Sequence, residues 1–390
     1  MPRPAHIAMV NVPAHGHVHP SLEVIRELVA RGHRVSYVND PSFTEQIEST
    51  GARLVPHETG LAILKGAAVR PGANMHGLLF DEARAMLPRM REAFEDDRPD
   101  LVLYDFMAYA GRALAEGWGV PSVLLAPSRI AWDVSDSEAF QTVVKALKAE
   151  GIPERFAQWL AENGVPAHDL FAYMMRPRRG VVLIPRALQA GIDRIDPEVY
   201  AFAGPCLGDR EFQGGWTRPQ DAQKVLLISL GSAFTHQPAF YRACLEAFGD
   251  LPGWHVVLQV GRATDPAELG PIPANVEVHP WVPQLAVLRQ ADAFVTHAGM
   301  GGCSEGLYCG LPMVAVPQSA DQFENADRLV ELGVARRVDT DRATPEALRS
   351  AVLELTSDPA VAARLTTLQA EVRAGGSASR AADLIEAALA

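Results

Sequence analysis

The chain has 390 residues, a formal net charge of −12 and 48% hydrophobic residues. This length favours two domains of about 200 residues, and an acidic chain without clustered Lys and Arg argues against nucleic-acid binding. The chain contains no run of about 18 apolar residues, so no membrane span is expected. Its four cysteines lack Cys-x-x-Cys spacing and fit reduced thiols in a cytoplasmic protein.

The first half of the chain alternates short apolar runs with amphipathic segments. The expected strands are 6–12, 34–39, 100–105 and 121–127, and the expected helices are 20–33 and 108–119. This alternation predicts a parallel sheet covered by helices. The segments 57–95 and 128–180 break the rhythm and are rich in Met, Phe and Trp, so we expect them at the ligand end of the sheet.

Three histidines, His15, His17 and His19, follow the first strand in the stretch VPAHGHVHP. They could bind a metal, because H-x-H pairs ligate zinc. One could be a general base, because imidazole titrates near neutral pH, or the stretch could be a polar loop without chemistry. A hydrolase metal site would need further ligands at later strand ends of one barrel, and this chain instead has two βα series. We therefore expect no metal site.

The second βα series begins after a polar stretch rich in Pro and Gly, which we interpret as a linker. We expect an N-terminal domain over 1–204, the linker over 205–223, a second domain over 224–375 and a final helix over 376–390. The predicted fold class is α/β, with two doubly wound Rossmann-like domains facing a cleft. The final helix could pack on either domain, including back on the first.

A strand, a histidine and three glycines precede a helical pattern in AFVTHAGMGGCSEGLYCG. Backbone N–H groups at such glycines, together with the positive end of the helix, can hold a diphosphate, and His297 can donate to one of its oxygens. A tight turn with a loop histidine explains the same pattern equally well. Nearby, Trp281 offers a flat face for a base, although it could also be a core residue. Glu305 can reach ribose hydroxyls from the new helix.

The whole segment 281–326 reads W-x-P-Q … T-H-x-G … E … P-x-x-x-D-Q-x-x-N-A, which resembles the nucleotide-sugar signature of glycosyltransferase family 1 and its GT-B fold. Stretches in both halves, such as AHGHVHPSLEVIRELVARGHRV and VLLISLGSAFTHQPAFYR, resemble the bacterial macrolide glycosyltransferases that inactivate oleandomycin-type antibiotics. Met300, Gly301 and Gly302 replace a Trp and polar residues of plant members, which matches the bacterial branch. The stretch 57–95 resembles the macrolide enzymes only loosely.

The resemblance implies a role for each matching residue of the donor site. Trp281 would stack on the uracil, Gln284 and Glu305 would bind ribose, and Asp321 with Gln322 would bind the sugar. His297 and nearby backbone groups would hold the diphosphate, including those of the phosphate-facing turn SLGSAF. The implied donor-binding residues are Gly231, Ser232, Trp281, Val282, Gln284, His297, Gly299, Gly301, Gly302, Glu305, Asp321 and Gln322.

The resemblance also assigns the catalytic pair. His17 would be the general base and Asp105 the carboxylate that stabilises its imidazolium, although position alone would also suit Asp105 as a helix N-cap. His15 and His19 would be loop residues. The acceptor would contact some of the Met and aromatic residues of the two irregular segments, since Met suits an adaptable pocket, and about half of these residues would be core. The candidates are Met75, Phe80, Ser128, Trp132 and Met174, with Met86, Met90, Phe171 and Met175 nearby.

The sequence thus predicts an inverting transferase that moves glucose from UDP-glucose to a hydroxyl of a macrolide or similar apolar natural product. No cofactor or metal is expected. The alternatives are a promiscuous flavonoid or polyketide transferase, a nucleotide-sugar epimerase or hydrolase, and a sensor without turnover. TDP could replace UDP, and the chain could be a monomer or a homodimer.

Overall fold

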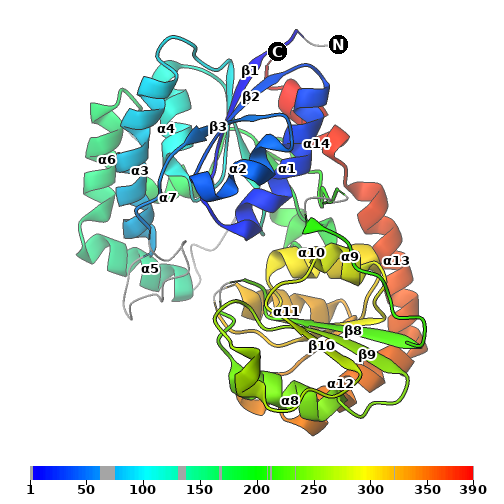
Figure 1. Cartoon of the computed structure of the whole chain (residues 1–390). Coiled ribbons are helices and arrows are strands. Elements are labelled where there is room, and N and C mark those ends of the chain that lie inside the picture. Colours follow the sequence, from blue (N-terminus) through cyan, green and yellow to red (C-terminus); the bar gives the residue numbers. More distant parts are fainter. Residues whose placement is uncertain are drawn as a thin grey trace. The chain divides into compact units, whose positions relative to one another are not determined.

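The computed structural model describes residues 3–61, 75–130, 138–166, 169–208, 210, 213–232, 234–319 and 321–389. The chain forms two compact units, each with its own parallel sheet (Figure 1). The first unit comprises Met1–Ile184, Gly191–Cys206 and Gly376–Ala390, and the second comprises Pro185–Ala190 and Leu207–Gly375.

The first unit contains a seven-stranded sheet with the order β3-β2-β1-β4-β5-β6-β7, and neighbouring strands pair in parallel. Strand β1, in the interior of this sheet, is buried at all five positions, as expected for a strand covered on both faces. The strands are β1 (His6–Val10), β2 (Arg34–Asn39), β3 (Arg53–Pro56), β4 (Leu101–Tyr104), β5 (Ser122–Ala126), β6 (Gly180–Val182) and β7 (Tyr200–Phe202).

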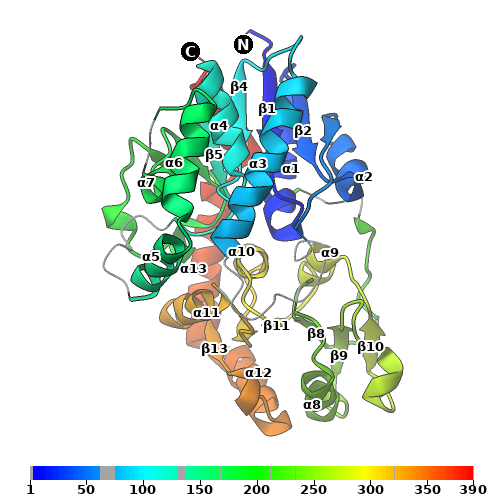
Figure 2. The same ribbon diagram turned by 90° about the vertical axis from the view of Figure 1, so that its left-hand side faces the viewer.

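Helices cover both faces of this sheet. In Figure 1, α1, α2 and α14 lie on one face and α3, α4 and α6 on the other, and Figure 2 shows α3 beside α4 and α6. The helices are α1 (His15–Ala30), α2 (Thr44–Glu48), α3 (Met75–Ala93), α4 (Tyr109–Trp118), α5 (Glu138–Ala149), α6 (Ile152–Glu162), α7 (Leu170–Met175) and α14 (Ala378–Glu386). In the part of the chain that the structure describes, no helix is both long and apolar enough to span a membrane.

The first helix begins five residues earlier than the sequence predicted. It starts at His15, and the N–H groups of His17 and Val18 both donate to the Ala14 carbonyl at 2.9 Å. Pro20 therefore lies inside the helix, where it removes only one N–H donor near the N-terminal end. A buried face that begins at Val18 and continues through Leu22 and on to Leu28 holds the helix on the sheet. The three histidines are consequently helical, which corrects their placement in a loop.

The irregular segments of the first half contain helices around one aromatic cluster. Phe156 of α6 lies at its centre, with its ring centroid 5.3 Å from that of Phe80, 5.5 Å from Trp159, 5.1 Å from Tyr173 and 6.0 Å from Tyr109. These rings join α3, α4, α6 and α7. The described parts of 57–95 and 128–180 are therefore partly core, since edge-to-face aromatic packing stabilises a buried cluster.

The second unit contains a six-stranded parallel sheet with the order β10-β9-β8-β11-β12-β13. In Figure 1, α8 and α12 lie on one face, and α9, α10, α11 and α13 lie on the other. The strands are β8 (Lys224–Ser229), β9 (Trp254–Gln259), β10 (Val276–His279), β11 (Ala293–Thr296), β12 (Met313–Ala315) and β13 (Ala335–Arg337). The helices are α8 (Pro238–Phe248), α9 (Gln284–Leu288), α10 (Met300–Cys309), α11 (Gln322–Glu331), α12 (Pro345–Ser357) and α13 (Pro359–Gly375).

Two stretches belong to the second unit although the sequence placed them elsewhere. Most of the expected linker is attached there: Trp216 donates to Glu277 at 3.3 Å, and Arg218 donates to the Gln290 carbonyl at 3.0 Å. The short stretch Pro185–Ala190 also joins this unit, where Arg328 donates to the Ala187 carbonyl at 2.8 Å. Local periodicity could not predict either attachment, because both depend on long-range hydrogen bonds.

The C-terminal helix α14 packs on the first unit, beside α1 (Figure 1). Arg31 at the end of α1 donates to Asp383 at 2.6 Å and to Glu386 at 2.9 Å. His33 also contacts Glu386 at 3.0 Å. The chain therefore returns to its first unit after completing the second, and charged pairs hold the returning helix there.

Candidate functional site

Both sheets reverse their strand order between two central strands. In the first unit the reversal lies between β1 and β4, and in the second it lies between β8 and β11. In open α/β sheets, ligands bind beyond the carboxyl ends of the strands at such a reversal. The residues that follow these four strands are therefore the first candidates for chemistry.

His17 and Asp105 meet at the reversal in the first unit. His17 lies in the first turn of α1, which follows β1, and Asp105 directly follows β4. Nδ1 of His17 lies 2.8 Å from Oδ2 of Asp105. Oδ1 of Asp105 accepts a hydrogen bond from the Met107 N–H at 2.8 Å. The parallel pairing of β1 with β4 thus brings together two residues that are 88 positions apart.

This geometry determines the tautomer of His17. A carboxylate can only accept hydrogen bonds, so Nδ1 of His17 carries the proton and Nε2 is left as the basic nitrogen. The Asp105 side chain is 1% exposed and the His17 side chain is 20% exposed. A buried carboxylate behind a partly exposed imidazole is the arrangement that supports general-base catalysis. Asp105 is not the N-cap of the next helix, because α4 begins at Tyr109 and Ala108 occupies the N-cap position.

The other two histidines occupy a different face of α1. His15 and His19 are four residues apart, so their side chains are neighbours on the helix surface, and their ring nitrogens approach to 3.3 Å. His19 also contacts Gln46 at 3.0 Å. Throughout the described ranges, no group of three or more His, Cys, Asp or Glu residues is arranged to hold a metal ion.

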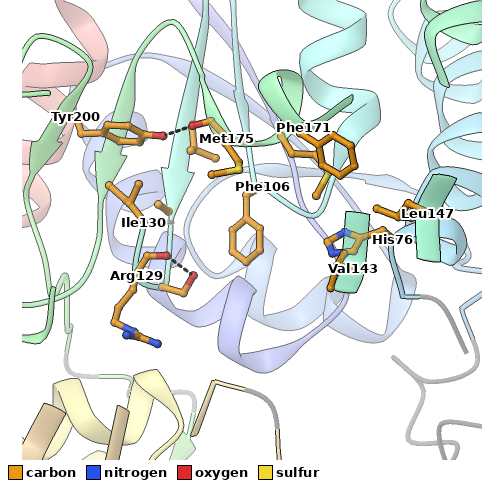
Figure 3. Close-up of a pocket in the computed structure, with 13 residues that line it drawn as sticks. His76, Phe106, Arg129, Ile130, Val143, Leu147, Phe171, Met175 and Tyr200 are labelled. Carbon is orange, nitrogen blue, oxygen red and sulfur yellow. Dashed lines mark hydrogen bonds between the residues drawn. The ribbon is translucent and has the colours of Figure 1, made fainter. Parts of the chain in front are cut away.

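An apolar cavity of about 250 Å³ adjoins this pair in the first unit (Figure 3). Phe106, which lines it, lies with its ring centroid 5.4 Å from that of His17. The cavity can therefore hold a mostly apolar molecule, and Phe106 connects its wall to the His17 ring. Its described lining consists of His76, Phe106, Leu124, Ala126, Ser128, Arg129, Ile130, Val143, Leu147, Phe171, Met174, Met175 and Tyr200.

The cavity includes only some of the predicted acceptor residues. Ser128 and Met174 line it, while Met75, the first residue of α3, is not among the described lining residues. Phe80 is 1% exposed and belongs to the aromatic cluster, which corrects its assignment to the pocket. Trp132 lies outside the residues that the structure describes.

The other Met and Phe residues predicted near the acceptor also divide into cavity-lining residues and core residues. Phe171 and Met175 line the cavity, whereas Met86 and Met90 are buried core residues of α3. Sequence reasoning missed His76 and other lining residues, because a residue type alone does not show which face of an irregular segment meets the cavity. Phe106 carried one usable signal, since it directly follows Asp105 at a strand end.

At the reversal in the second unit, two glycines enclose His297. A Cβ atom at Gly231, which follows β8, would lie 2.6 Å from Cε1 of His297. A Cβ atom at Gly299 would lie 2.4 Å from Nε2 of the same ring. Real Cβ atoms do not approach ring atoms this closely, so both positions need glycine for the imidazole to take this place.

The residue after His297 has an unusual backbone. Ala298 has φ +60, a conformation that non-glycine residues rarely adopt. Its N–H donates to Thr296 Oγ1 at 3.2 Å, and its carbonyl accepts from Asn325 Nδ2 at 3.0 Å. Backbone strain that neighbouring bonds hold in place is characteristic of functional sites. Here the conformation of Ala298 turns the chain sharply between His297 and the start of α10.

The glycines that follow belong to a helix rather than to a loop. Helix α10 begins at Met300, so Gly301 and Gly302 lie in its first turn, which corrects the expected start at Cys303. Gly302 packs on β11, where a Cβ atom would lie 3.1 Å from Thr296 Oγ1. The first N–H groups of a helix have no intrahelical partner and carry partial positive charge. They can receive an anion next to His297.

Burial lowers the pKa of His297 to about 4. Its Nδ1 is buried without a partner among the described residues. The unfolded chain, in which an ordinary histidine titrates near 6.5, therefore binds the proton first as pH falls. The contribution of the neutral ring to the free energy of unfolding is therefore fully present above pH 6.5, and it is lost as the pH falls towards 4.

We expect His297→Gln to reduce the acid sensitivity of the fold, because glutamine does not titrate. Between pH 7 and pH 4.5 the variant should lose about 1–2 kcal/mol less free energy of unfolding than the wild type. This figure is smaller than the full pKa shift implies because the residue is only half-buried. Urea denaturation at the two pH values measures the difference. Equal losses in the two proteins would contradict this role for burial.

The predicted ribose-binding residues form one hydrogen-bonded group. Glu305 of α10 is 3% exposed, and its Oε2 accepts a hydrogen bond from Gln284 Nε2 at 2.7 Å. Its Oε1 accepts from Arg210 Nη1 at 2.6 Å. Sequence reasoning missed Arg210, which lies in the stretch interpreted as a linker and gave no motif. This arginine gives the buried carboxylate an ion-pair partner and helps to orient it.

Trp281 and Val282 lie in the loop before α9 and differ in exposure. Trp281 is 47% exposed, whereas Val282 is 3% exposed and donates its N–H to Gln259 Oε1 at 3.1 Å. Gln259 also donates to the Gly231 carbonyl at 2.9 Å, so one side chain joins the tryptophan loop to the glycine turn. An exposed indole on an anchored loop can serve as a stacking surface for a base. Ser232, next to Gly231, is exposed at the same turn.

Trp281→Ala is expected to weaken UDP binding, because stacking of a base on an aromatic side chain contributes about 1–3 kcal/mol. The dissociation constant should rise about tenfold or more, as measured by isothermal titration calorimetry. A tryptophan of the first unit, Trp118, provides the control, since Trp118→Ala should leave UDP affinity unchanged. Equal affinities of the wild type and Trp281→Ala would remove the stacking role.

The last two predicted donor residues precede or begin α11. Gln322 accepts hydrogen bonds at Oε1 from the N–H groups of Gln318 at 2.8 Å and Ser319 at 3.1 Å. Oδ2 of Asp321 accepts from Asn325 Nδ2 at 2.9 Å. Because Asn325 also holds the Ala298 carbonyl, this segment is connected to the His297 turn. The structure thus gathers the predicted donor residues at one edge of the second sheet.

Comparisons with known proteins agree with this architecture. A model of the family "UDP-glucoronosyl and UDP-glucosyl transferase" matches residues 212–370. The chain is 53% identical to the oleandomycin glycosyltransferase of Streptomyces antibioticus, over 99% of this chain and 91% of that protein. It is 37% identical to the NDP-glycosyltransferase YjiC of Bacillus licheniformis, over 99% and 98% of the two chains.

Among solved structures, the glycotransferase of kitacinnamycin is similar over 100% of both chains, with 52% identity and a TM-score of 0.92. The predicted GT-B class, with two doubly wound α/β domains, is confirmed by this match and by the two sheets. The chain therefore belongs to the UDP-glucoronosyl and UDP-glucosyl transferase family and is a glycosyltransferase.

Proposed function

We propose that this glycosyltransferase moves a sugar, with glucose from UDP-glucose as the first candidate, to a hydroxyl group of a macrolide or similar large apolar natural product. The modified product would be inactivated or altered in activity. The observation that carries the proposal is the 2.8 Å contact between His17 and Asp105 beside an apolar cavity. The similarity to a protein named for oleandomycin supports the acceptor class.

In the proposed reaction, Nε2 of His17 removes the proton of the acceptor hydroxyl as its oxygen attacks the anomeric carbon. The bond between that carbon and the nucleotide diphosphate breaks, and its electron pair leaves on the phosphate oxygen. A single displacement of this kind inverts the configuration at the anomeric carbon. The proton remains on the imidazole, where the Asp105 carboxylate stabilises the positive charge.

The donor would be held by the second unit. The first turn of α10 can place backbone N–H groups against the diphosphate, and the neutral ring of His297 can donate one further hydrogen bond. Gly231 and Ser232 lie at the neighbouring strand end. Glu305, with Gln284, would meet the ribose, and Asp321 and Gln322 would meet the sugar, as the family resemblance implies.

On this account the diphosphate is stabilised by helix and histidine hydrogen bonds without a metal ion. We expect the transfer rate to be unchanged by excess EDTA and by added Mg²⁺ or Mn²⁺. Initial rates with UDP-glucose and a macrolide acceptor, measured by chromatography, provide the test. A rate that disappears with EDTA and returns with Mn²⁺ would show that a metal replaces the proposed donors.

The acceptor and donor classes are tested by competition. The protein is incubated with UDP-glucose or TDP-glucose and an equimolar mixture of an oleandomycin-type macrolide, a flavonol and a simple sugar, and products are identified by mass spectrometry. The expected product is the macrolide with one added hexose, with an inverted anomeric configuration by NMR. Exclusive modification of the simple sugar would overturn the apolar acceptor class. Preference for the flavonol would retain the mechanism and exclude the macrolide.

A further inference from the structure

His76 introduces a polar group into the wall of the otherwise largely apolar cavity. It is the second residue of α3, and Figure 3 shows its ring among the lining side chains, on the same side as Leu147. Nδ1 of His76 lies 3.0 Å from the hydroxyl of Tyr109 in α4. This bond holds the ring in one orientation. Its direction depends on which ring nitrogen of His76 carries the proton.

The surroundings of Tyr109 decide the direction of this hydrogen bond. Tyr109 is 4% exposed, and burial raises the pKa of its hydroxyl, which therefore stays protonated. Among the described residues, Nδ1 of His76 is the hydroxyl's one polar partner. A buried O–H that lacks an acceptor is costly. Tyr109 is therefore the donor in this bond, and Nδ1 of His76 is the acceptor.

Burial also lowers the pKa of His76, so the ring is neutral at pH 7. A neutral imidazole has one proton, and with Nδ1 accepting, that proton is on Nε2. Nε2 has no hydrogen-bond partner in the ranges that the structure describes, and it is not one of the buried unpaired atoms. The ring thus offers a single N–H donor of defined orientation at the cavity wall.

We propose that His76 is a specificity-determining residue whose Nε2–H donates a hydrogen bond to an oxygen atom of the acceptor substrate. The oxygen would belong to a carbonyl, ether or hydroxyl group. This inference rests on the proposed function, because it concerns the molecule that occupies the cavity beside His17.

The arrangement selects against acceptors that present hydrocarbon or a protonated amine to His76. Hydrocarbon would leave the N–H without a partner, and an ammonium group would place two donors against each other. Most of the lining, including Phe106 and Met175, is apolar and has little directional preference, so an oriented donor affects how the acceptor lies. That orientation determines which hydroxyl reaches His17.

Two variants at this position separate hydrogen bonding from packing. His76→Leu removes the donor and keeps most of the side-chain volume, whereas His76→Gln retains an N–H donor. With an oleandomycin-type macrolide as the probe, we expect His76→Leu to raise the acceptor KM and Kd about tenfold, with kcat and the donor KM nearly unchanged. His76→Gln should restore most of the lost affinity. An unchanged Kd in His76→Leu, or equal increases in both variants, would overturn the proposal.

The tautomer is measured independently of any acceptor. In long-range ¹H–¹⁵N spectra of protein labelled with ¹⁵N-histidine, the His76 signals are identified by their loss in His76→Leu. We expect the Nε2–H tautomer in the wild type and a mixture of tautomers in Tyr109→Phe. A wild-type Nδ1–H tautomer would overturn the proposal.

The two readouts also distinguish this inference from the proposed function. If the wild type binds the macrolide without transferring hexose, the proposed function fails, and the Kd comparison still tests His76. If the flavonol is bound and the macrolide is not, the same comparison is made with the flavonol. Equal Kd values across the variants then reject the role of His76.

Discussion

Replacing His17 with alanine is expected to lower kcat by about 10²–10⁴, the usual contribution of a positioned general base. The reason lies in the 2.8 Å contact with Asp105, which leaves Nε2 as the nitrogen that can accept the acceptor's proton. Without the imidazole, the hydroxyl must attack as a neutral nucleophile. Steady-state rates at saturating donor and acceptor measure the loss, and calorimetry should show nearly unchanged UDP affinity.

The same helix provides a matched control. His15 lies two residues earlier, contacts His19 on another face of α1, and has no role in the proposed reaction. His15→Ala should therefore retain wild-type kcat. Asp105→Asn should also lower kcat, because an amide no longer stabilises the imidazolium and can favour the wrong tautomer. If His17→Ala keeps the wild-type kcat with a hydroxyl acceptor, the assignment of the base is wrong.

The second large effect is expected from Gly299→Ala. The added methyl group would lie 2.4 Å from Nε2 of His297, so the imidazole must leave its place. Gly299 has φ −63, which alanine adopts readily, so the damage comes from the contact rather than from the backbone. Loss of the histidine hydrogen bond to a diphosphate should raise the donor KM about 10- to 100-fold. Initial rates at varied UDP-glucose concentration measure it.

A double-mutant cycle shows whether this effect acts through His297. In a His297→Ala background the ring is absent, so Gly299→Ala should add little further loss. Thermal unfolding of each variant checks that the fold is retained. If the two substitutions add fully, the methyl group acts on something other than the imidazole, and the role given to the glycine is incorrect.

Both candidate sites arise from the same feature of the parallel sheet. When consecutive crossovers proceed in opposite directions from two central strands, no helix covers the gap beyond their carboxyl ends, and loop residues from both strands meet there. In the first unit this brings together His17 and Asp105, and in the second it brings together Gly231 and His297. Residues that are distant in the sequence become neighbours because the strand order places them side by side.

Local sequence patterns were enough to predict the α/β class, the two βα series and the residues at most strand ends. Apolar runs of strand length and helical periodicity are local properties, so strands such as β1 and β8 could be located from the residues alone. The same local succession of strand, turn and helix start predicted the turn at His297, whereas the family resemblance implied the other predicted donor residues. The start of α1 was wrong because Pro20 was interpreted as a beginning signal and lies within the helix.

Which residues face one another depends on tertiary packing. Phe80 and Met174 are both large apolar residues in irregular segments, and only packing places the first in the aromatic cluster and the second at the cavity. Likewise, Arg210 reaches Glu305 across 95 positions, and Tyr109 contacts His76 from a neighbouring helix. Such contacts depend on strand order, helix rotation and burial, which arise when distant segments pack together. Local periodicity therefore cannot predict them.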